Sequence, residues 1–397
     1  MKILLTAGLR LLAACLVLYA LLVAVTLLAF PLPGRGMPFN TASAGSTVFE
    51  TEAKYFVMNR AAFSAPGTHV VFLGASNTVG GFPVSLTQAQ LPDAVVSNAA
   101  LSGSNLTQIH EAFQLTRRAI KPKDRAHTVY VIGLWYGLFD DDSLHWPHVS
   151  GQPQQTAIDT ELYRYHFYRR AAHGPVPVVP EHLIPMVTIG IYPVIALEKI
   201  VRVVTEPVRE AYLGAQPGRT DQERDEYVAS ALDKHEETAY WRTFFPAGVV
   251  DVHQFAVLDS LVNEARADGS AVVLVNLPIP AWHSAAVSYD ADYQARLHAL
   301  IARHEGDPLF STISMRDMNS DSWFCDEVHP KPHIIPLWVR RIAAPVNAVV
   351  ARVDERAPAQ AANGANNDAN GAAKAGTHVN TPIDTRLTSA GTGAPKS

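Results

Sequence analysis

Cysteine and charge are both scarce in this chain of 397 residues. There are only two cysteines, Cys15 and Cys325, which is too few for a disulfide framework. Charged residues make up 17% of the chain and the formal net charge is −5. Binding to nucleic acid needs a concentrated basic face, and the sequence has none. We therefore expect neither a disulfide-stapled fold nor a nucleic-acid partner.

Hydrophobic residues, by contrast, make up 48% of the chain, enough for a sizeable core. Leu11 to Phe30 is a run without a charge, and its length suits a helix that crosses a bilayer. Lys2 and Arg10 precede the run and place the N-terminus in the cytoplasm, by the excess of positive charge on that side. The sequence predicts a single-pass anchor in the inner or plasma membrane, with the remainder in the periplasm or outside the cell.

The run also has two other interpretations. A cleaved signal peptide has a shorter apolar region and a cleavage site of small residues, and no convincing site follows Phe30. Leu12-Ala13-Ala14-Cys15 resembles a lipoprotein cleavage box, but the apolar run continues well beyond the cysteine. An uncleaved anchor explains the run best.

Strand and helix patterns alternate in the rest of the chain. Strands are predicted at 69–73, 128–134, 271–277 and 309–314, and helices at 105–120, 252–267, 290–304 and 336–352. This alternation predicts an α/β fold with a parallel sheet covered on both faces. We divide the chain into an anchor (1–30), a juxtamembrane segment with one short helix (31–65), a domain (66–355) and a disordered tail (356–397).

The domain carries a mainly helical insertion at about 140–245. It contains an apolar stretch, Leu183 to Val204, which is interrupted by two prolines and ends with three charged residues. Prolines and charges argue against a second membrane span. An interfacial helix, or one that covers a groove, fits the stretch better.

Ser76 lies just past the first predicted strand, among small residues. Ligands bind at the carboxyl ends of strands in open α/β sheets, and a serine that begins a helix there has free backbone N–H groups beside it. Such groups can stabilise an oxyanion. A serine that merely caps a helix is the alternative, and on this feature alone it is favoured.

Asp326 and His329 change that balance. Two residues separate them, so one turn can bring the carboxylate to the imidazole, which can then act as a base toward a serine. They lie in a predicted loop before the last helix. An incidental Asp-x-x-His is the alternative in a chain with sixteen histidines. Together with Ser76, the pair favours a catalytic triad.

These segments resemble the SGNH/GDSL hydrolases. Gly74-Ala75-Ser76-Asn77 is similar to the nucleophile block, with Ala75 where the family usually has Asp. The segment 97–103 is similar to the second block, and Asp326 and His329 match the last. The resemblance implies a flavodoxin-like three-layer α/β/α fold with Ser76 as nucleophile, His329 as base and Asp326 as its orienting partner. It also implies that Ser76 and Gly103 donate backbone N–H groups to the oxyanion hole.

The third block of the family is altered. The family has Gly-x-Asn-Asp, and its asparagine completes the oxyanion hole, whereas this chain has Gly133-Leu134-Trp135-Tyr136-Gly137. Tyr136 could supply an O–H donor there or form an aromatic wall. The anchor, the insertion and this change resemble DltD-like proteins and envelope polysaccharide O-acetylation proteins, which move acyl groups outside the membrane.

Several other residues are candidates for the site. Asn77 and Trp135 adjoin the blocks and are predicted to contact substrate. Trp282 and His283 follow a predicted strand and either line the substrate groove or belong to a structural loop. Asp140 to Asp142 with His145 and His148 match no strong metal motif, so no metal and no cofactor are predicted. Cys325 is predicted to pack beside Asp326.

The predicted function is acyl transfer or ester hydrolysis on a glycan or acylated polymer of the cell envelope. A membrane protein that supplies acyl groups is the expected partner. Transferase is preferred over hydrolase by analogy to the family. The alternatives are an inactive member of the fold that binds glycan or acts as a scaffold, and an anchored lipase or thioesterase.

Overall fold

The computed structural model describes residues 2–32, 38–142, 161–171, 174–213 and 219–375. The chain divides into two compact units, Met1–Asp354 and Glu355–Ser397. The first unit holds the sheet, the insertion and every residue predicted for the site.

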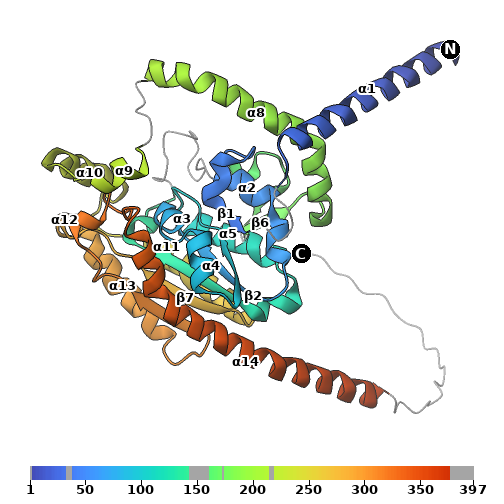
Figure 1. The fold of residues 1–397 in the computed structure, drawn as a ribbon. Coiled ribbons are helices and arrows are strands. Elements are labelled where there is room, and N and C mark those ends of the chain that lie inside the picture. The colour runs from blue at the N-terminus through green and yellow to red at the C-terminus, as the bar shows by residue number, and fades with distance from the viewer. Residues whose placement is uncertain (1, 33–37, 143–160, 172–173, 214–218, 376–397) are drawn as a thin grey trace, which may run out of the picture. The chain divides into compact units, whose positions relative to one another are not determined.

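The centre of this unit is a parallel sheet of six strands in the order β1-β3-β2-β4-β7-β8 (Figure 1). The strands are β1 (Phe39–Asn40), β2 (Thr68–Leu73), β3 (Ala94–Asn98), β4 (Thr128–Leu134), β7 (Ala271–Asn276) and β8 (Phe310–Ser314). Every residue of β2, β4 and β7 is buried, as expected for central strands covered on both faces. The α/β class with a parallel sheet is therefore confirmed.

Alternate side chains of the strands enter two separate hydrophobic clusters. Val71 and Leu73 belong to one cluster, which includes apolar residues of α5 (Leu106–Ala119) and α11 (Val252–Ala267). Val70 and Phe72 belong to the other, which includes apolar residues of α4 (Val84–Gln90) and the first part of α14 (Ile335–Ala375). Because side chains alternate along a strand, the two clusters lie on opposite faces of the sheet.

The strongly patterned elements lie where the sequence predicts them. β4 and α11 have the predicted bounds, and α13 (Tyr289–Arg303) is shifted by one residue. The Asn105 side chain caps α5 by accepting the N–H groups of Thr107 and Gln108, and Gln108 returns a bond to the Asn105 N–H. This reciprocal cap explains the sharp start of α5.

Two features differ from the prediction: the sheet has two additional strands, and the last helix is longer. Strands β1 and β3 were not predicted as strands, and β1 comes from the juxtamembrane segment and pairs with β3. The short helix expected in that segment is α2 (Glu52–Met58). Helix α14 extends to Ala375, into the segment predicted to be disordered, because alanine favours helix. The remainder of that tail, 376–397, lies outside the described residues.

The described part of the insertion consists of a hairpin and helices. The elements are β5 (Tyr168–Ala171), β6 (Gly174–Pro177), α8 (Ile184–Leu213), α9 (Asp221–Glu226) and α10 (Ala231–Phe244). The N-terminal run forms helix α1 (Lys2–Ala29). Among the described residues, two helical stretches are long and apolar enough to cross a membrane, Lys2–Ala29 and Glu181–Val208.

The other short helices connect these elements. They are η1 (Thr41–Ser46), η2 (Arg60–Ser64), α3 (Ser76–Gly81), η3 (Pro122–His127), η4 (Tyr136–Leu138), η5 (Glu181–Leu183), α12 (Ala281–Ala286) and η6 (Asp321–Trp323).

Candidate active site

Ser76 is the first residue of α3, directly after the turn that ends β2. The turn is tight because Gly74 and Gly133, at the ends of the adjacent strands β2 and β4, leave room for the Thr78 side chain. A Cβ at either glycine would lie 2.2 Å from the Thr78 hydroxyl, and Gly74 has a φ of +151°. As the first residue of α3, Ser76 has a backbone N–H outside the helix's internal hydrogen bonds.

Asp326 and His329 form a closed turn before α14. One oxygen of the Asp326 carboxylate accepts the backbone N–H groups of Val328 at 2.9 Å and His329 at 2.7 Å. The other accepts from His329 Nδ1 at 2.7 Å. The Cys325 N–H donates to the His329 carbonyl at 3.0 Å and closes the turn. The carboxylate therefore fixes both the turn and the orientation of the imidazole.

The second imidazole nitrogen reaches Ser76. His329 Nε2 lies 2.8 Å from Ser76 Oγ, although the two residues are 253 positions apart in the sequence. The side chains of His329 and Asp326 are 27% and 32% exposed, so the group is open to a ligand. The structure brings together the three residues predicted as nucleophile, base and orienting partner.

Burial and pairing act in opposite directions on the two titrating members of this group. Burial raises the pKa of Asp326, but the charge and hydrogen bonds of His329 outweigh it and hold that pKa below the usual value. Burial lowers the pKa of His329, but the charge and hydrogen bond of Asp326 outweigh it and raise that pKa. The pair thus favours a charged imidazolium, the state that a base reaches when it takes a proton from serine.

Glu327 is a second acidic group in the same turn, and the sequence analysis missed it. Its side chain accepts the indole N–H of Trp241 at 3.1 Å, and Trp241 lies on α10 of the insertion. Burial, with the nearby charges of Asp326 and Glu237, raises the pKa of Glu327 to about 7. Burial and the charge of Asp326 also raise the pKa of Glu237. Its place beside Asp326 in the motif is the only signal that the sequence offers.

The insertion contacts the turn at further points. Arg219 donates to the Cys325 carbonyl at 3.4 Å, and Asp225 accepts from His333 Nδ1 at 2.8 Å. A cavity of about 120 Å³ lies between the insertion and the turn. It is lined by residues that include Trp282, Glu237 and Asp326, so Trp282 lies at a hollow beside Asp326.

Cys325 packs beside Asp326, as predicted. Its sulfur lies 4.0 Å from an Asp326 carboxylate oxygen, and the residue is buried. Burial and the charge of Asp326 raise the pKa of the thiol. A raised pKa keeps the thiol protonated, so it is a weak nucleophile.

Tyr136 and His283 form a buried pair. The Tyr136 hydroxyl is in hydrogen-bond contact with His283 Nε2, and the two rings stack with centroids 5.7 Å apart. Burial raises the pKa of Tyr136 and lowers that of His283 to about 4, so both are neutral at pH 7. The predicted role of Tyr136 in the oxyanion hole would require its hydroxyl to leave or share this contact with His283.

Three predicted substrate contacts have a buried side-chain nitrogen without a partner among the described residues. These atoms are Asn77 Nδ2, Trp135 Nε1 and His283 Nδ1. The indole ring of Trp135 also packs against Trp241, with centroids 4.8 Å apart. Buried polar groups are nearly always hydrogen-bonded, so these three nitrogens are exceptions to the usual pattern.

Gly103 lies in the turn after β3, where its φ of +71° suits glycine. The turn is held against the end of β2, because the Leu101 N–H and the Ser104 hydroxyl donate to the Gly74 carbonyl at 2.9 and 3.3 Å. Glu52 accepts the Ser102 hydroxyl at 2.8 Å from the other side. Gly103 is therefore fixed in a turn that contacts the turn leading to Ser76.

The acidic run Asp140 to Asp142, which follows η4, contributes to structure. The Asp142 carboxylate accepts from the side chains of Asn105 at 2.5 Å, Thr107 at 3.0 Å and Gln254 at 3.1 Å. Within the described ranges, no cluster of three or more His, Cys, Asp or Glu residues could hold a metal ion. His145 and His148 lie outside those ranges.

The geometry suits nucleophilic chemistry at Ser76, since a base contacts the hydroxyl and a carboxylate orients the base. Comparison with known proteins adds no identity to this geometry: no family model matches the chain, and no curated protein matches its sequence.

Proposed function

We propose that this protein is a membrane-anchored serine acyltransferase or esterase that acts on O-acyl groups of a cell-envelope glycan or polymer. The observation that carries the proposal is the continuous series of contacts from Asp326 through His329 to Ser76. A serine alone is a poor nucleophile at neutral pH, and a contacting, oriented imidazole is the usual means of activating it.

In the proposed reaction the Ser76 hydroxyl oxygen attacks the carbonyl carbon of an acyl ester while its proton moves to His329 Nε2. The carbon–oxygen bond to the leaving alcohol then breaks, and His329 returns the proton to that alcohol. In the second half a sugar hydroxyl or water gives its proton to His329 and attacks the acyl-enzyme. A new ester or a free acid leaves, and Ser76 regains its proton.

The proposed oxyanion hole consists of the backbone N–H groups of Ser76 and Gly103 with a third donor in place of the family's asparagine. Tyr136 stays the predicted third donor. Trp135 is a further candidate, because its indole N–H is buried and has no partner within the described part of the chain. One such donor contributes about 10²–10³ in rate in serine hydrolases.

The strand order supports assignment to the flavodoxin-like, SGNH-type fold. Without the short edge strand β1, the order β3-β2-β4-β7-β8 numbers 2-1-3-4-5 along the chain. Ligands bind such sheets where the order reverses, between the first and third strands, and Ser76 follows β2 at that point. The exposed apolar helix α1 supports a single-pass anchor, with the N-terminus cytoplasmic and the domain periplasmic or extracellular.

Labelling with a fluorophosphonate probe on the full-length protein in detergent tests the proposal. We expect the probe to attach to Ser76 in the unaltered protein and to be lost in Ser76→Ala. The control is Ser46→Ala, which removes an exposed hydroxyl outside the site. Labelling that persists in Ser76→Ala, or is absent from the unaltered protein, contradicts the proposal.

A second candidate is a member of the same fold that binds glycan without catalysis. The contact between the Tyr136 hydroxyl and His283 favours this candidate. A hydroxyl that is bonded to His283 is not free to stabilise an oxyanion. Absence of labelling at Ser76, together with binding of an acylated oligosaccharide that Trp282→Ala weakens, would select this candidate. An anchored lipase or thioesterase would instead label at Ser76 and prefer acyl-lipid or thioester substrates.

A further inference from the structure

Helix α8 of the insertion has its charged residues on the side that contacts the protein. From residue 198 to residue 206, the positions that are not fully exposed are Glu198, Lys199 and Glu206, all charged. A surface helix of a soluble protein normally buries its apolar stripe and exposes its charges. This part of α8 has the reverse arrangement.

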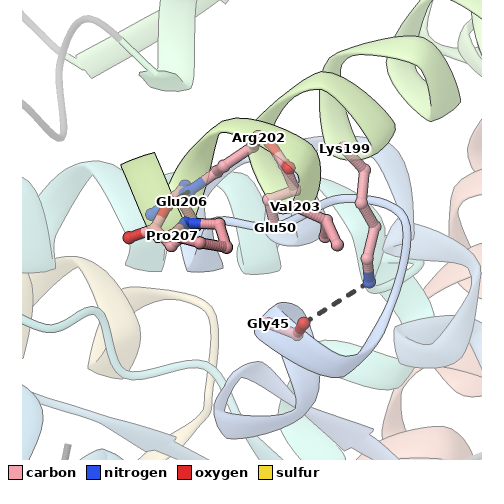
Figure 2. Close-up of a pocket in the computed structure, with 7 residues that line it drawn as sticks. All are labelled: Gly45, Glu50, Lys199, Arg202, Val203, Glu206 and Pro207. Atoms are coloured by element: carbon pink, nitrogen blue, oxygen red, sulfur yellow. Dashed lines mark hydrogen bonds and ion pairs between the residues drawn. The ribbon is translucent and has the colours of Figure 1, made fainter. Parts of the chain in front are cut away.

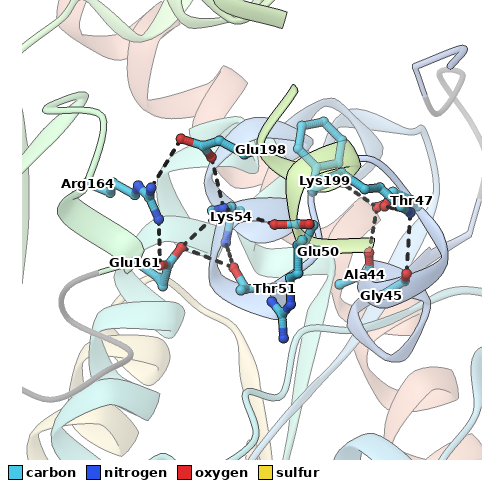
Figure 3. Close-up of polar contacts among 12 residues, drawn as sticks. Ala44, Gly45, Thr47, Glu50, Thr51, Lys54, Glu161, Arg164, Glu198 and Lys199 are labelled. Atoms are coloured by element: carbon cyan, nitrogen blue, oxygen red, sulfur yellow. Dashed lines mark hydrogen bonds and ion pairs between the residues drawn. The ribbon is translucent and has the colours of Figure 1, made fainter. Parts of the chain in front are cut away.

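The charged side of α8 is held by a buried ionic cluster (Figure 3). Glu198 lies 3.2 Å from the ammonium of Lys54, whose side chain is only 3% exposed, and accepts the Tyr165 hydroxyl at 2.9 Å. Glu50 and Glu161 lie 3.6 and 3.8 Å from the same ammonium. A buried cation with several carboxylates fixes α8 to α2, since separating them would leave uncompensated charge.

A second set of contacts lies farther along the same side of the helix. Lys199 reaches toward η1 and donates to the Gly45 and Thr47 carbonyls, the first at 3.5 Å (Figure 2). Arg202 and Glu206 pair along the helix at 3.8 Å beside the same segment. The polar side of α8 thus faces the protein, and the contacts of Glu198 and Lys199 determine its orientation.

The opposite side of the helix is apolar and uncovered. The exposed fractions of six aliphatic residues lie between 46% and 70%: Val194, Leu197, Ile200, Val201, Val204 and Val208. At 3.6 residues per turn these six span about 120° of the helix surface. A face of this width is broader than the seam through which a helix pairs in a coiled coil. It is wide enough for a helix that lies against a large apolar surface. We call this set the apolar face of α8.

The apolar face continues from a contact with the N-terminal helix. α1 and α8 pack against each other, and the Tyr19 hydroxyl donates to the Gly190 carbonyl at 2.5 Å (Figure 1). Tyr19 lies about 15 Å before the end of α1 along its axis, at 1.5 Å per residue. If α1 spans the bilayer, Tyr19 lies near the middle of the apolar run Leu11 to Phe30, so this contact places the start of α8 within the bilayer. The apolar face begins at Val194, about one helical turn beyond Gly190.

A second transmembrane span is the competing arrangement for α8. Glu198 and Lys199 lie within the helical stretch Glu181–Val208 and are bound to α2 and η1 of the globular unit. A span would carry these polar segments into the hydrocarbon, where charges are costly. A helix in the plane of the membrane surface avoids that cost, because its polar side stays on the protein and its apolar side meets the lipid.

From this arrangement we propose that the apolar face of α8 lies in the lipid interface of the bilayer and holds the domain against the membrane beside α1. The inference rests on the proposed anchoring by α1. It gives the domain a fixed orientation in place of a free tether and limits its substrates to those within reach of the membrane surface.

Site-directed spin labelling of the full chain in nanodiscs of phosphatidylcholine and phosphatidylglycerol tests this. In a Cys325→Ala background the native Cys15 carries the label and reports on α1. In a background that also has Cys15→Ala, labels are placed at Val201→Cys and Val204→Cys on the apolar face. Val228→Cys, on an exposed aliphatic residue between α9 and α10, is the matched control. Collision with oxygen reports lipid exposure, and collision with a nickel chelate reports water exposure.

We expect labels at 201 and 204 to collide with oxygen and to lose collision with the nickel chelate, as the label on Cys15 does, while the label at 228 remains open to nickel. Fluorophosphonate labelling of each variant at Ser76 checks that the fold is intact. Nickel access at 201 and 204 equal to that at 228, with Cys15 shielded, overturns the inference and leaves the anchor in place. Nickel access at Cys15 overturns the anchor itself.

Two further outcomes identify other occupants of the apolar face and also overturn the inference. Spin–spin broadening between labels at 201 on different molecules would show a second copy of this chain. Protection at 201 and 204 from both oxygen and nickel would show a protein partner.

Discussion

Asp326 and Glu327 are adjacent carboxyl groups that face two different regions. Asp326 turns toward the sheet edge, where His329 holds its pKa low. Glu327 turns toward the insertion, where burial and the charges of Asp326 and Glu237 raise its pKa to about 7. At pH 7 the Asp326 carboxyl is therefore ionised, whereas the Glu327 carboxyl is about half protonated. The sheet edge supplies the reacting groups, and burial against the insertion reduces the second negative charge beside them.

The largest expected effect comes from the sheet side. Asp326→Asn keeps the size of the side chain but removes the charge that orients and stabilises the His329 imidazolium. We expect the rate of fluorophosphonate labelling at Ser76 to fall by about 10⁴, as in other serine triads. Glu327→Gln is the matched control and should stay within about tenfold of the unaltered protein, because the Glu327 side chain contacts Trp241 and neither His329 nor Ser76. Equal losses in both variants would remove the distinction between the two carboxyls.

On the insertion side the expected effect is on stability. The folded-state pKa of Glu327 is raised to about 7 from 4.5, so the unfolded chain ionises first and stability is lost as pH rises from about 4.5 to 7. Glu327→Gln removes this loss. The free energy of unfolding of the variant, relative to that of the unaltered protein, should therefore be about 2 to 3 kcal/mol higher at pH 8 than at pH 4. Urea unfolding across that range measures the difference. Parallel stability curves would show that the pKa of Glu327 is the same in the folded and the unfolded chain.

The site residues at the sheet edge could be predicted from the sequence, whereas the contacts made by the insertion could not. Ser76, Asp326 and His329 are predictable because each belongs to a local motif at a strand end or in a loop, and a parallel sheet brings such ends to one edge. Thr128 to Leu134 is predictable because a fully buried strand is a continuous apolar run.

The contact between Trp241 and Glu327 was not predictable. It joins positions 86 residues apart, and it forms through the docking of α10, a helix whose sequence shows no clear apolar periodicity. The strand β1 was missed because its two residues are too few to carry a pattern. The apolar stretch of α8 was visible in the sequence, but which of its sides the protein covers depends on Lys54, in a different segment.

The pH dependence of the labelling rate tests whether His329 is the base that accepts the Ser76 proton. His329 must be neutral to accept the Ser76 proton, and Asp326 raises its pKa above 6.5. The labelling rate should therefore rise about tenfold per pH unit at low pH and level off above the pKa of His329. In Asp326→Asn the midpoint should move to lower pH, since the charge that raised the pKa is gone. A profile that is flat from pH 5 to pH 8 would show that His329 is not the base.

Trp241→Phe is expected to have the smallest effect and tests whether the insertion acts on the turn through a single hydrogen bond. The ring still packs against Trp135 and Tyr136, but the N–H to Glu327 is lost. We expect a loss of about 1 kcal/mol in the free energy of unfolding. The control is Tyr240→Phe, which removes an exposed hydroxyl from the same helix. In a double-mutant cycle with Glu327→Leu, the two losses should not add, because both changes remove the same bond. Additive losses would mean that α10 stabilises the turn by packing alone and that the hydrogen bond from the Trp241 indole to Glu327 contributes nothing to stability.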